Sequence, residues 1–452
     1  MRRPPRLLGV LFVIVVVAAA CSSTADDAVS SGSVDAGSSD GSDDATSADG
    51  ADAQPSDGEV FSPTETDRPF DLSGGATTSD EGVTVDAANA TARSSAVVNA
   101  SESWETDWAR ATIDTATLAV GIPRPDPRDV VGGGVIDVPK FESVAAATQW
   151  LEPVEPGALV QLDGEARFYP LSILTRHEVV NDRFGDVPVA VTYCPLCNTA
   201  LSFDRRVDGE VLRFGTSGLL RNSDLVMWDD VTESLWQQVT GEGIVGELAG
   251  TDLVPVSTAI VSFGQFAADF GDGLSLSRDT GVGSNYGANP YQGYSQRASP
   301  IGGFIDVDTI DPRFPALERV VGVDLDTGEA KAYPFSVITV EQVVNDTLGD
   351  TPVAVFWGGD TADALSAGAV ADGDQIGTGI AFDRRLGDRV LTFTPNGDGT
   401  FTDDQTGSVW TLTGLAVSGD LEGQRLVTVT HRNEFWFTWD AFFGDAEVYE
   451  AS

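Results

Sequence analysis

The residues of this chain best suited to chemistry are two cysteines, Cys194 and Cys197, spaced as Cys-x-x-Cys. Such a pair can close as a redox disulfide or hold a soft metal ion. The only other cysteine, Cys21, ends an apolar run near the N-terminus. Exported thiols that no metal holds usually oxidise. We therefore expect Cys194 and Cys197 either to bind a metal or to form a disulfide.

One cysteine pair cannot fill a metal site, so further ligands are required. The Cys-Pro-x-Cys pattern after an apolar strand resembles one knuckle of zinc ribbons and rubredoxins, and those sites have two knuckles. The candidates for the remaining ligands are His177, Met227, and Asp229 or Asp230. This soft ligand set favours copper or zinc over calcium or magnesium. The alternatives are a buried hydrogen-bonded His177, a core-filling Met227 and a plain Cys194–Cys197 disulfide.

An internal repeat organises the chain around these residues. Residues 169–182 match residues 333–346 at a constant offset of 164, and the same offset aligns residues 185–191 with 349–355. Further matches join 203–206 to 382–385 and 229–236 to 403–410. We therefore predict two degenerate copies of one strand-helix-strand-rich unit, packed together. Their ranges are about 155–262, the first segment, and 319–447, the second segment.

The local patterns within each segment predict an α+β fold that is mainly β. In the first segment, short strands are expected over 158–162 and 166–169, and Pro170 suits the first turn of a helix over 171–181. The continuous apolar run over 187–193 predicts a buried strand that leads to Cys194.

The second segment serves as an internal control for the candidate site. It keeps the expected helix, the buried strand and the Thr-x-Ser-x-Trp pattern, but it has Gly358 and Thr361 in place of the cysteines. It also has Glu341 in place of His177. Because these three residues vanish together, we predict a site confined to the first segment. A Gly- and Tyr-rich loop over 277–294 either rims that site or is a surface connection.

The N-terminus has the pattern of an export signal. Arginines precede an apolar run over 7–17, and three alanines lead directly to Cys21. Small residues before a cysteine resemble the lipobox of bacterial and archaeal lipoproteins, in which that cysteine is lipidated. The alternatives are an ordinary cleaved signal peptide and a short membrane anchor. We predict a lipoprotein signal peptide over 1–21 and lipidation of Cys21, which places the protein on the extracytoplasmic face of the cell membrane.

The composition changes sharply after Cys21. Residues 22–67 are dominated by Ser, Asp, Ala and Gly, and such a segment buries too little apolar surface to offset its ordering entropy. We expect a disordered acidic tether over 22–95 and a folded body over 96–452. The formal net charge of −44 argues against nucleic acid as a partner. The lipid anchor makes the membrane a partner, and the sequence predicts no particular protein partner.

The chain resembles the DUF3179 family of exported bacterial and archaeal proteins of unknown function over most of residues 150–450. The motifs that carry this resemblance are His177-Glu178-x-Val-Asn181-Asp182, Tyr193-Cys194-Pro-Leu-Cys197-Asn-Thr199, Phe214-Gly-x-Ser217-Gly-Leu-Leu, Leu225-Val-Met227-Trp-Asp229, Thr232-x-Ser234-Leu-Trp236-x-Gln238 and the loop from Asp279 to Tyr294. The family usually has Gly where Asn198 stands and often Tyr where Trp228 stands. The resemblance implies a shared fold and no mechanism.

Three functional hypotheses follow from these observations. The first is a lipid-anchored protein with a Cys-x-x-Cys/His soft-metal site that handles copper or zinc. The second is a thiol–disulfide or metal-dependent oxidoreductase that uses Cys194 and Cys197. The third is a non-catalytic cell-surface binding protein with a structural disulfide.

Overall fold

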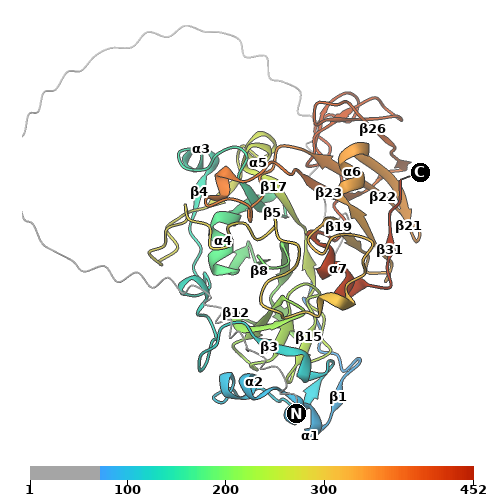
Figure 1. Ribbon diagram of the computed structural model, residues 1–452. Coiled ribbons are helices and arrows are strands. Elements are labelled where there is room, and N and C mark those ends of the chain that lie inside the picture. The colour runs from blue at the N-terminus through green and yellow to red at the C-terminus, as the bar shows by residue number, and fades with distance from the viewer. Residues whose placement is uncertain (1–71, 452) are drawn as a thin grey trace, which may run out of the picture. The chain divides into compact units, whose positions relative to one another are not determined.

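The computed structural model describes residues 72–451 of the chain, and these residues are mainly β (Figure 1). The expected signal peptide, Cys21 and residues 22–71 of the expected tether lie outside the described residues. None of the helices in residues 72–451 is long and apolar enough to cross a bilayer.

The chain before the first segment forms short elements. They are β1 (Thr84–Val85), α1 (Ala87–Ala92), α2 (Ser95–Ala100), β2 (Arg110–Ala111), the 3-10 helix η2 (Thr115–Thr117), β3 (Leu118–Val120), η3 (Val131–Gly133), β4 (Phe141–Ser143) and α3 (Val144–Ala147). The expected boundary between tether and body at residue 96 therefore differs from the structure, because β1 and α1 lie before it. Strand β1 pairs with β2, and Ala76 forms a bridge with Val207 of the first segment.

The first segment is a succession of strands with one helix near its start. Its elements are β5 (Pro156–Leu162), β6 (Glu165–Pro170), α4 (Leu171–His177), β7 (Val179–Phe184), β8 (Val187–Cys194), β9 (Thr199–Asp204), β10 (Arg206–Val207), β11 (Glu210–Val211), β12 (Phe214–Arg221), β13 (Asp224–Asp229), β14 (Leu235–Gln237), β15 (Gly243–Val245), β16 (Pro255–Val256) and β17 (Thr258–Ser262). The connection to the second segment contains α5 (Phe263–Asp269), β18 (Leu274–Leu276) and η4 (Val307–Thr309).

The second segment has a closely similar order of elements. They are β19 (Arg319–Asp324), β20 (Ala330–Pro334), α6 (Phe335–Glu341), β21 (Val343–Leu348), β22 (Thr351–Gly358), η5 (Val370–Asp372), β23 (Thr378–Asp383), β24 (Arg385–Leu386), β25 (Arg389–Val390), β26 (Phe393–Pro395), β27 (Phe401–Asp403), β28 (Val409–Trp410), β29 (Ala416–Ser418), β30 (His431–Phe435), α7 (Trp436–Phe443) and β31 (Glu447–Val448).

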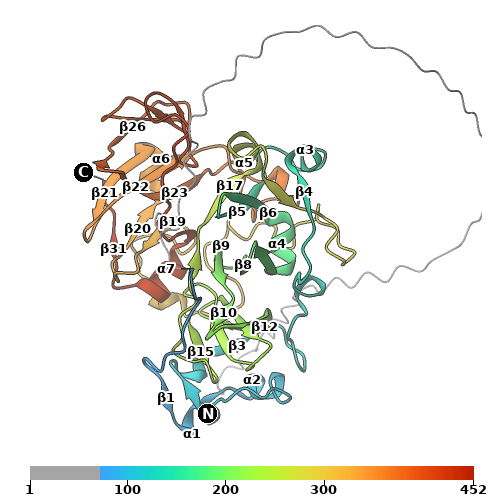
Figure 2. The same ribbon diagram turned by 180° about the vertical axis from the view of Figure 1, so that it is seen from behind.

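The sheets of the two segments are built from corresponding strands. Strands run in the order β17-β5-β6-β18-β4 in one sheet and β30-β19-β20-β31 in another, and β18 and β31 are each parallel to the strand that they join. The hairpins that follow give the orders β16-β9-β8-β7 and β21-β22-β23. The largest sheet, β1-β2-β15-β14-β13-β12-β3, combines strands from the chain before the first segment with strands of the first segment (Figure 2).

The helix after each first hairpin is shorter than the sequence pattern predicts. Helix α4 ends at His177, and β7 begins at Val179, whereas the pattern predicts helix as far as residue 181. The reason is local, because Glu178 has φ 60° and this left-handed conformation stops the helix. Gln342 has φ 61° and ends α6 in the same way. The chain therefore turns directly from helix into strand at both places.

The buried strand expected over 187–193 is confirmed as β8. All eight residues of β8 are buried, and the strand lies between β7 and β9. Its side chains belong to a core cluster that also includes Met227 and Trp236 of the neighbouring sheet. Since β8 is central and buried on both faces, the turn at its end is held rigidly inside the protein.

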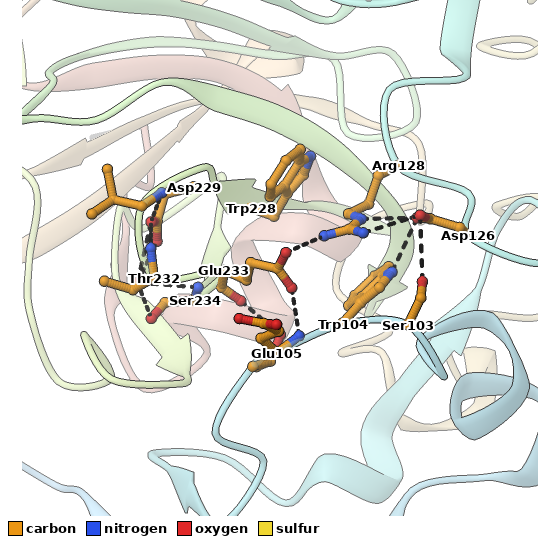
Figure 3. A network of polar contacts seen from close by, with 12 residues as sticks. Ser103, Trp104, Glu105, Asp126, Arg128, Trp228, Asp229, Thr232, Glu233 and Ser234 are labelled. Atoms are coloured by element: carbon orange, nitrogen blue, oxygen red, sulfur yellow. Dashed lines mark hydrogen bonds and ion pairs between the residues drawn. The ribbon is translucent and has the colours of Figure 1, made fainter.

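The chain before the first segment is fixed to the β12–β15 part of the large sheet by a stacked arginine. The Arg128 guanidinium lies 5.1 Å from the ring centre of Trp104 and 4.8 Å from that of Trp228 (Figure 3). It also forms ion pairs with Asp126 at 2.8 Å and Glu233 at 2.9 Å. Cation–π contacts and partly buried ion pairs together stabilise this attachment.

Candidate metal centre

The two cysteines lie in the tight turn that joins β8 to β9. Cys194 is the last residue of β8, and its partner across the hairpin is Thr199. The Cys197 N–H donates to the Cys194 carbonyl oxygen at 3.2 Å, and Asn198 completes the turn with φ 57°. Both cysteines are free thiols and are buried, with exposed fractions of 2% and 0%. The turn thus holds both sulfurs at the same end of a buried strand.

A third ligand group comes from Asp224, which begins β13. Its carboxylate oxygen and the sulfurs of Cys194 and Cys197 all lie within 4.8 Å of one another, and all three residues are buried. Asn222 and Ser223, both with positive φ, form the turn that brings the start of β13 to this point. Three such atoms around one point match the reach of a transition-metal ion.

One oxygen of the Asp224 carboxylate accepts hydrogen bonds from N–H donors, while the other accepts none from an N–H or O–H group. Oδ2 accepts hydrogen bonds from Gln237 Nε2 at 2.6 Å and from the Val239 N–H at 3.1 Å. Oδ1 is buried and accepts no N–H or O–H hydrogen bond, and the thiols of Cys194 and Cys197 interact with this carboxylate. A buried carboxylate oxygen without such a donor is costly, and a metal ion would satisfy it.

The protonation of the metal-free site follows from its burial. Burial raises the pKa of the Cys194 thiol and raises that of Cys197 further still. Burial also raises the pKa of Asp224 to about 6, against the opposing effect of its bonds to Gln237 and Val239. Without a metal the thiols are therefore protonated at neutral pH. A bound cation would reverse this preference, since metal ligands bind in their deprotonated form.

The C-terminal end of the loop over 277–294 contacts the cysteine turn. The Tyr294 hydroxyl donates to the Leu196 carbonyl oxygen at 2.8 Å, within the turn itself. The Tyr291 hydroxyl donates to Glu178 Oε1 at 3.3 Å. Glu178 is fully buried, and burial raises its pKa to about 8.

The second segment also contacts the cysteine turn. The Phe435 N–H donates to the Cys197 carbonyl oxygen at 3.0 Å, and Asn198 Nδ2 donates to the Asn433 carbonyl oxygen at 3.1 Å. Strand β30 of the second segment therefore covers the turn. The candidate centre lies where the two segments meet, although its three ligand groups all come from the first.

The structure places His177 in a different network. Its Nδ1 lies 2.6 Å from the Gly134 carbonyl oxygen, and its Nε2 lies 2.8 Å from the Tyr286 hydroxyl. Both ring nitrogens thus have partners, and His177 is not part of the cluster of Cys194, Cys197 and Asp224. This arrangement corresponds to the alternative of a buried, hydrogen-bonded histidine.

Asp229 is not part of the cluster of Cys194, Cys197 and Asp224 either, and Met227 lies in the same buried core as the two cysteines. Met227 is fully buried in the core beside Trp236, as the core-filling alternative expects. Asp229 accepts a hydrogen bond from the Thr232 N–H at 2.7 Å (Figure 3). It also accepts one from Trp236 Nε1 at 2.9 Å. Asp230 is exposed and accepts from the Arg213 N–H.

The second segment repeats the contacts of Asp229. Asp403 accepts from the Thr406 N–H at 2.6 Å and from Trp410 Nε1 at 2.9 Å. Because the same bonds form where no cysteine is present, they hold a turn of the fold together and do not require a metal.

Sequence reasoning missed two acidic residues, Asp224 and Glu178. For Glu178 a signal was present, since the aligned residue of the second segment is the neutral Gln342. For Asp224 the residue type gives no signal. When Asp229 is aligned with Asp403, the residue aligned with Asp224 is Asp398, which is exposed and bonds to Thr400.

Comparison with known proteins gives one match. A family model described as "Protein of unknown function (DUF3179)" matches residues 135–446. No curated protein and no solved structure matches the chain.

Proposed function

The chain belongs to the DUF3179 family, a family of unknown function, and we propose that its body binds one metal ion through Cys194, Cys197 and Asp224. The observation that carries this proposal is the convergence of two buried sulfurs and a carboxylate within 4.8 Å. The buried Oδ1 of Asp224 supports it, because no N–H or O–H group donates to this oxygen and a metal ion would satisfy it.

The ligand chemistry favours zinc. Two thiolates suit either zinc or copper(I), but a carboxylate is a hard ligand that suits zinc better than copper(I). Asp224 in place of the expected His177 therefore moves the choice from copper towards zinc. Two thiolates and one carboxylate would leave the centre with a net charge of −1, and Gln237 and Val239 would orient the carboxylate from outside.

Metal analysis of protein purified without a histidine tag tests this proposal. We expect about one zinc ion per chain, and Cys194→Ser or Asp224→Asn should abolish stoichiometric binding. Asp398→Asn is the matched control, since Asp398 is the exposed aspartate aligned with Asp224. Wild-type protein that holds no metal after incubation with zinc or copper would contradict the proposal.

The thiol–disulfide oxidoreductase is the second candidate, because the two sulfurs lie within reach of each other. Burial and the raised pKa values of both thiols disfavour it, since the reactive form is an accessible thiolate. Thiol titration separates the candidates. If the cysteines bind a metal, two thiols per chain body become titratable after chelation without reduction. If they form a disulfide, catalytic or structural, two thiols become titratable only after reduction.

We also propose that the protein is exported and anchored to the membrane by lipid on Cys21, with an acidic tether before the body. The support is the sequence of residues 1–67 alone. Cys21→Ser should release or misprocess the protein, as membrane fractionation would detect. A processed mutant that remains with the membrane would contradict the anchor.

Finally, we propose that the two segments are degenerate copies of one unit. The supporting contacts are equivalent in both. Tyr169 donates to Asp182 as Tyr333 does to Asp346, and Asn181 bonds to the backbone of Phe214 as Asn345 does to that of Phe393. Superposition of β5–β9 on β19–β23 in an experimental structure would test this origin.

A further inference from the structure

A support run of three residues, 237–239, holds the carboxylate of the third ligand. Its first side chain and its last N–H both donate to Asp224 Oδ2, at 2.6 Å and 3.1 Å. Between them, Gln238 Nε2 donates to Thr192 Oγ1 at 2.8 Å, in the strand that leads to the cysteines. The position of the Asp224 carboxylate relative to the two sulfurs therefore depends on this run.

Two arginines hold the two ends of the support run. Arg432 Nη1 donates to the Val239 carbonyl oxygen at 3.2 Å. Arg221 Nη1 donates to Gln237 Oε1 at 3.3 Å. Arg432 is buried, and its Nη2 forms an ion pair with Asp324 at 2.5 Å. Each residue that donates to the third ligand is therefore itself bonded to an arginine.

Both arginines stack on the last turn of helix α7 in the second segment. The Arg221 guanidinium lies 5.4 Å from the ring centre of Phe442. The Arg432 guanidinium lies 4.5 Å from the ring centre of Phe443. The residue before α7 donates its N–H to the Cys197 carbonyl oxygen. One helix of the second segment thus follows a contact with the cysteine turn and ends on the two arginines.

The repeat shows that the fold does not need the buried arginine. The residue of the first segment at the position of Arg432 is Ala259, since each lies four residues before the helix that follows its strand. Thr413, which aligns with Val239, donates through Oγ1 directly to Asp269 of α5 at 2.5 Å. A buried arginine carries a desolvation cost that alanine avoids, so its presence beside the third ligand indicates a role at the centre.

We propose that Arg432 and Arg221 are positioning residues of the metal centre, which orient the Asp224 carboxylate through the support run. This inference rests on the proposed function, and neither arginine is a ligand. When either arginine is removed, the support run loses one of its fixed points, so the carboxylate leaves the orientation that binds the ion more often. The metal affinity of the first segment therefore depends on helix α7 of the second.

The test measures the Zn²⁺ affinity by competition with a chelator, and the visible bands of Co²⁺-loaded protein, which report the coordination geometry. In one variant the ion pair is removed as a unit, Arg432→Met with Asp324→Asn, because a lone buried charge would destabilise the fold. The other variant is Arg221→Met, at a partly exposed side chain. Each should bind Zn²⁺ about 10–100-fold more weakly than the wild type, as is typical when a partner of a ligand is lost. Each should also shift the Co²⁺ bands, which a purely structural role would leave unchanged.

Arg425→Met is the matched control, because Arg425 is an arginine of the same kind at the corresponding helix. It stacks on Phe270, directly after α5, at 4.1 Å from the ring centre, and it donates to the Asp269 carbonyl oxygen at 2.7 Å. Its contacts thus lie at α5 and not at the support run. The Zn²⁺ affinity and the Co²⁺ bands of this variant should match the wild type.

The outcomes separate the inference from the proposed function. Near-UV circular dichroism first reports whether each variant folds, and if the double variant does not fold, Arg221→Met decides alone. Wild-type affinity and bands in a folded variant would overturn the role of its arginine. An equal loss of affinity in Arg425→Met would overturn the inference as a whole, because the effect would then be a general one. Wild-type protein that binds neither Zn²⁺ nor Co²⁺ would overturn the proposed function as well.

Discussion

The two segments differ most in the connection that follows their central strand. In the first segment a four-residue turn, residues 195–198, joins β8 directly to β9. In the second segment β22 ends at Gly358 and β23 begins at Thr378, with η5 between them. The strands and their pairing are otherwise similar. The tight turn over 195–198 brings the two thiols to one point. The site therefore depends on this turn, whereas the fold depends on the strands that both segments share.

A second difference concerns the hairpin that carries the third ligand. Strands β12 and β13 have eight and six residues, and both Ser223 of the turn between them and Asp224 at the start of β13 are buried. Strands β26 and β27 have three residues each, and Asp398 in their connection is exposed. The same amino acid is thus a candidate ligand in one segment and a surface residue in the other. The length of the hairpin decides this, because it sets whether the turn reaches the core.

The largest effect should come from the tryptophans that both segments use to hold the Asp-Thr-Ser turn. Trp236 and Trp410 are fully buried and donate to Asp229 and Asp403. Trp236→Ala and Trp410→Ala should each lower the free energy of unfolding by about 3–5 kcal/mol, measured by chemical denaturation. A large cost for one variant and a negligible cost for the other would break the equivalence of the segments.

A large effect of pH is expected in the first segment. Burial raises the folded-state pKa of Glu178 from 4.5 to about 8, so this group stabilises the metal-free protein at low pH, and the stabilisation is lost as the pH rises through 8. The loss amounts to at most about 5 kcal/mol. Glu178→Gln should therefore flatten the dependence of stability on pH between about 4.5 and 8.

Glu341→Gln is the control for this pH dependence. Some dependence should persist in both variants, because burial also raises the pKa of Glu434 to about 8. Denaturant unfolding of metal-free protein at several pH values is the measurement. A pH profile of Glu178→Gln that matches the wild type would show that Glu178 is not desolvated as the structure indicates.

A moderate effect should follow from removing the charge of the aspartates that bind the two tryptophans. Asp229→Asn and Asp403→Asn should each cost about 1–3 kcal/mol of stability, because both carboxylate oxygens accept hydrogen bonds and asparagine replaces one of them by an NH2 donor. Neither variant should change the metal content. Selective loss of metal from Asp229→Asn would restore Asp229 as a ligand and would remove its equivalence with Asp403.

The smallest effect should come from the tyrosine near the end of the second strand, β6 or β20, in each segment. Tyr169→Phe and Tyr333→Phe each remove one hydrogen bond, to Asp182 and Asp346 respectively. Each should cost about 1 kcal/mol, and thermal unfolding can compare the two. A difference well above that value would indicate that the two networks are not equivalent. The ion pair between Arg167 and Asp182 in the first segment would be the first explanation to test.

The sequence by itself determined the features that depend on neighbouring residues. The apolar run over 187–193 identified a buried strand, because burial on both faces requires a continuous run of apolar side chains. The Cys-x-x-Cys spacing identified the turn that carries the sulfurs, and the match of 169–182 with 333–346 identified the two segments. The end of the helix was missed by several residues, since the positive φ of Glu178 is not visible in an apolar pattern.

Only the tertiary structure decided which residues meet the cysteines. The sequence predicts His177 as a ligand beside Cys194 and Cys197, because it ends the helix that leads into the hairpin of β7 and β8. Its ring nitrogens instead bond to Gly134 and Tyr286. Asp224 comes from a hairpin in another sheet, and its position depends on the length of β12 and β13 and on the positive φ of Asn222 and Ser223. Sequence patterns report the local conformation of the chain, whereas a site assembled from separate sheets depends on how those sheets pack.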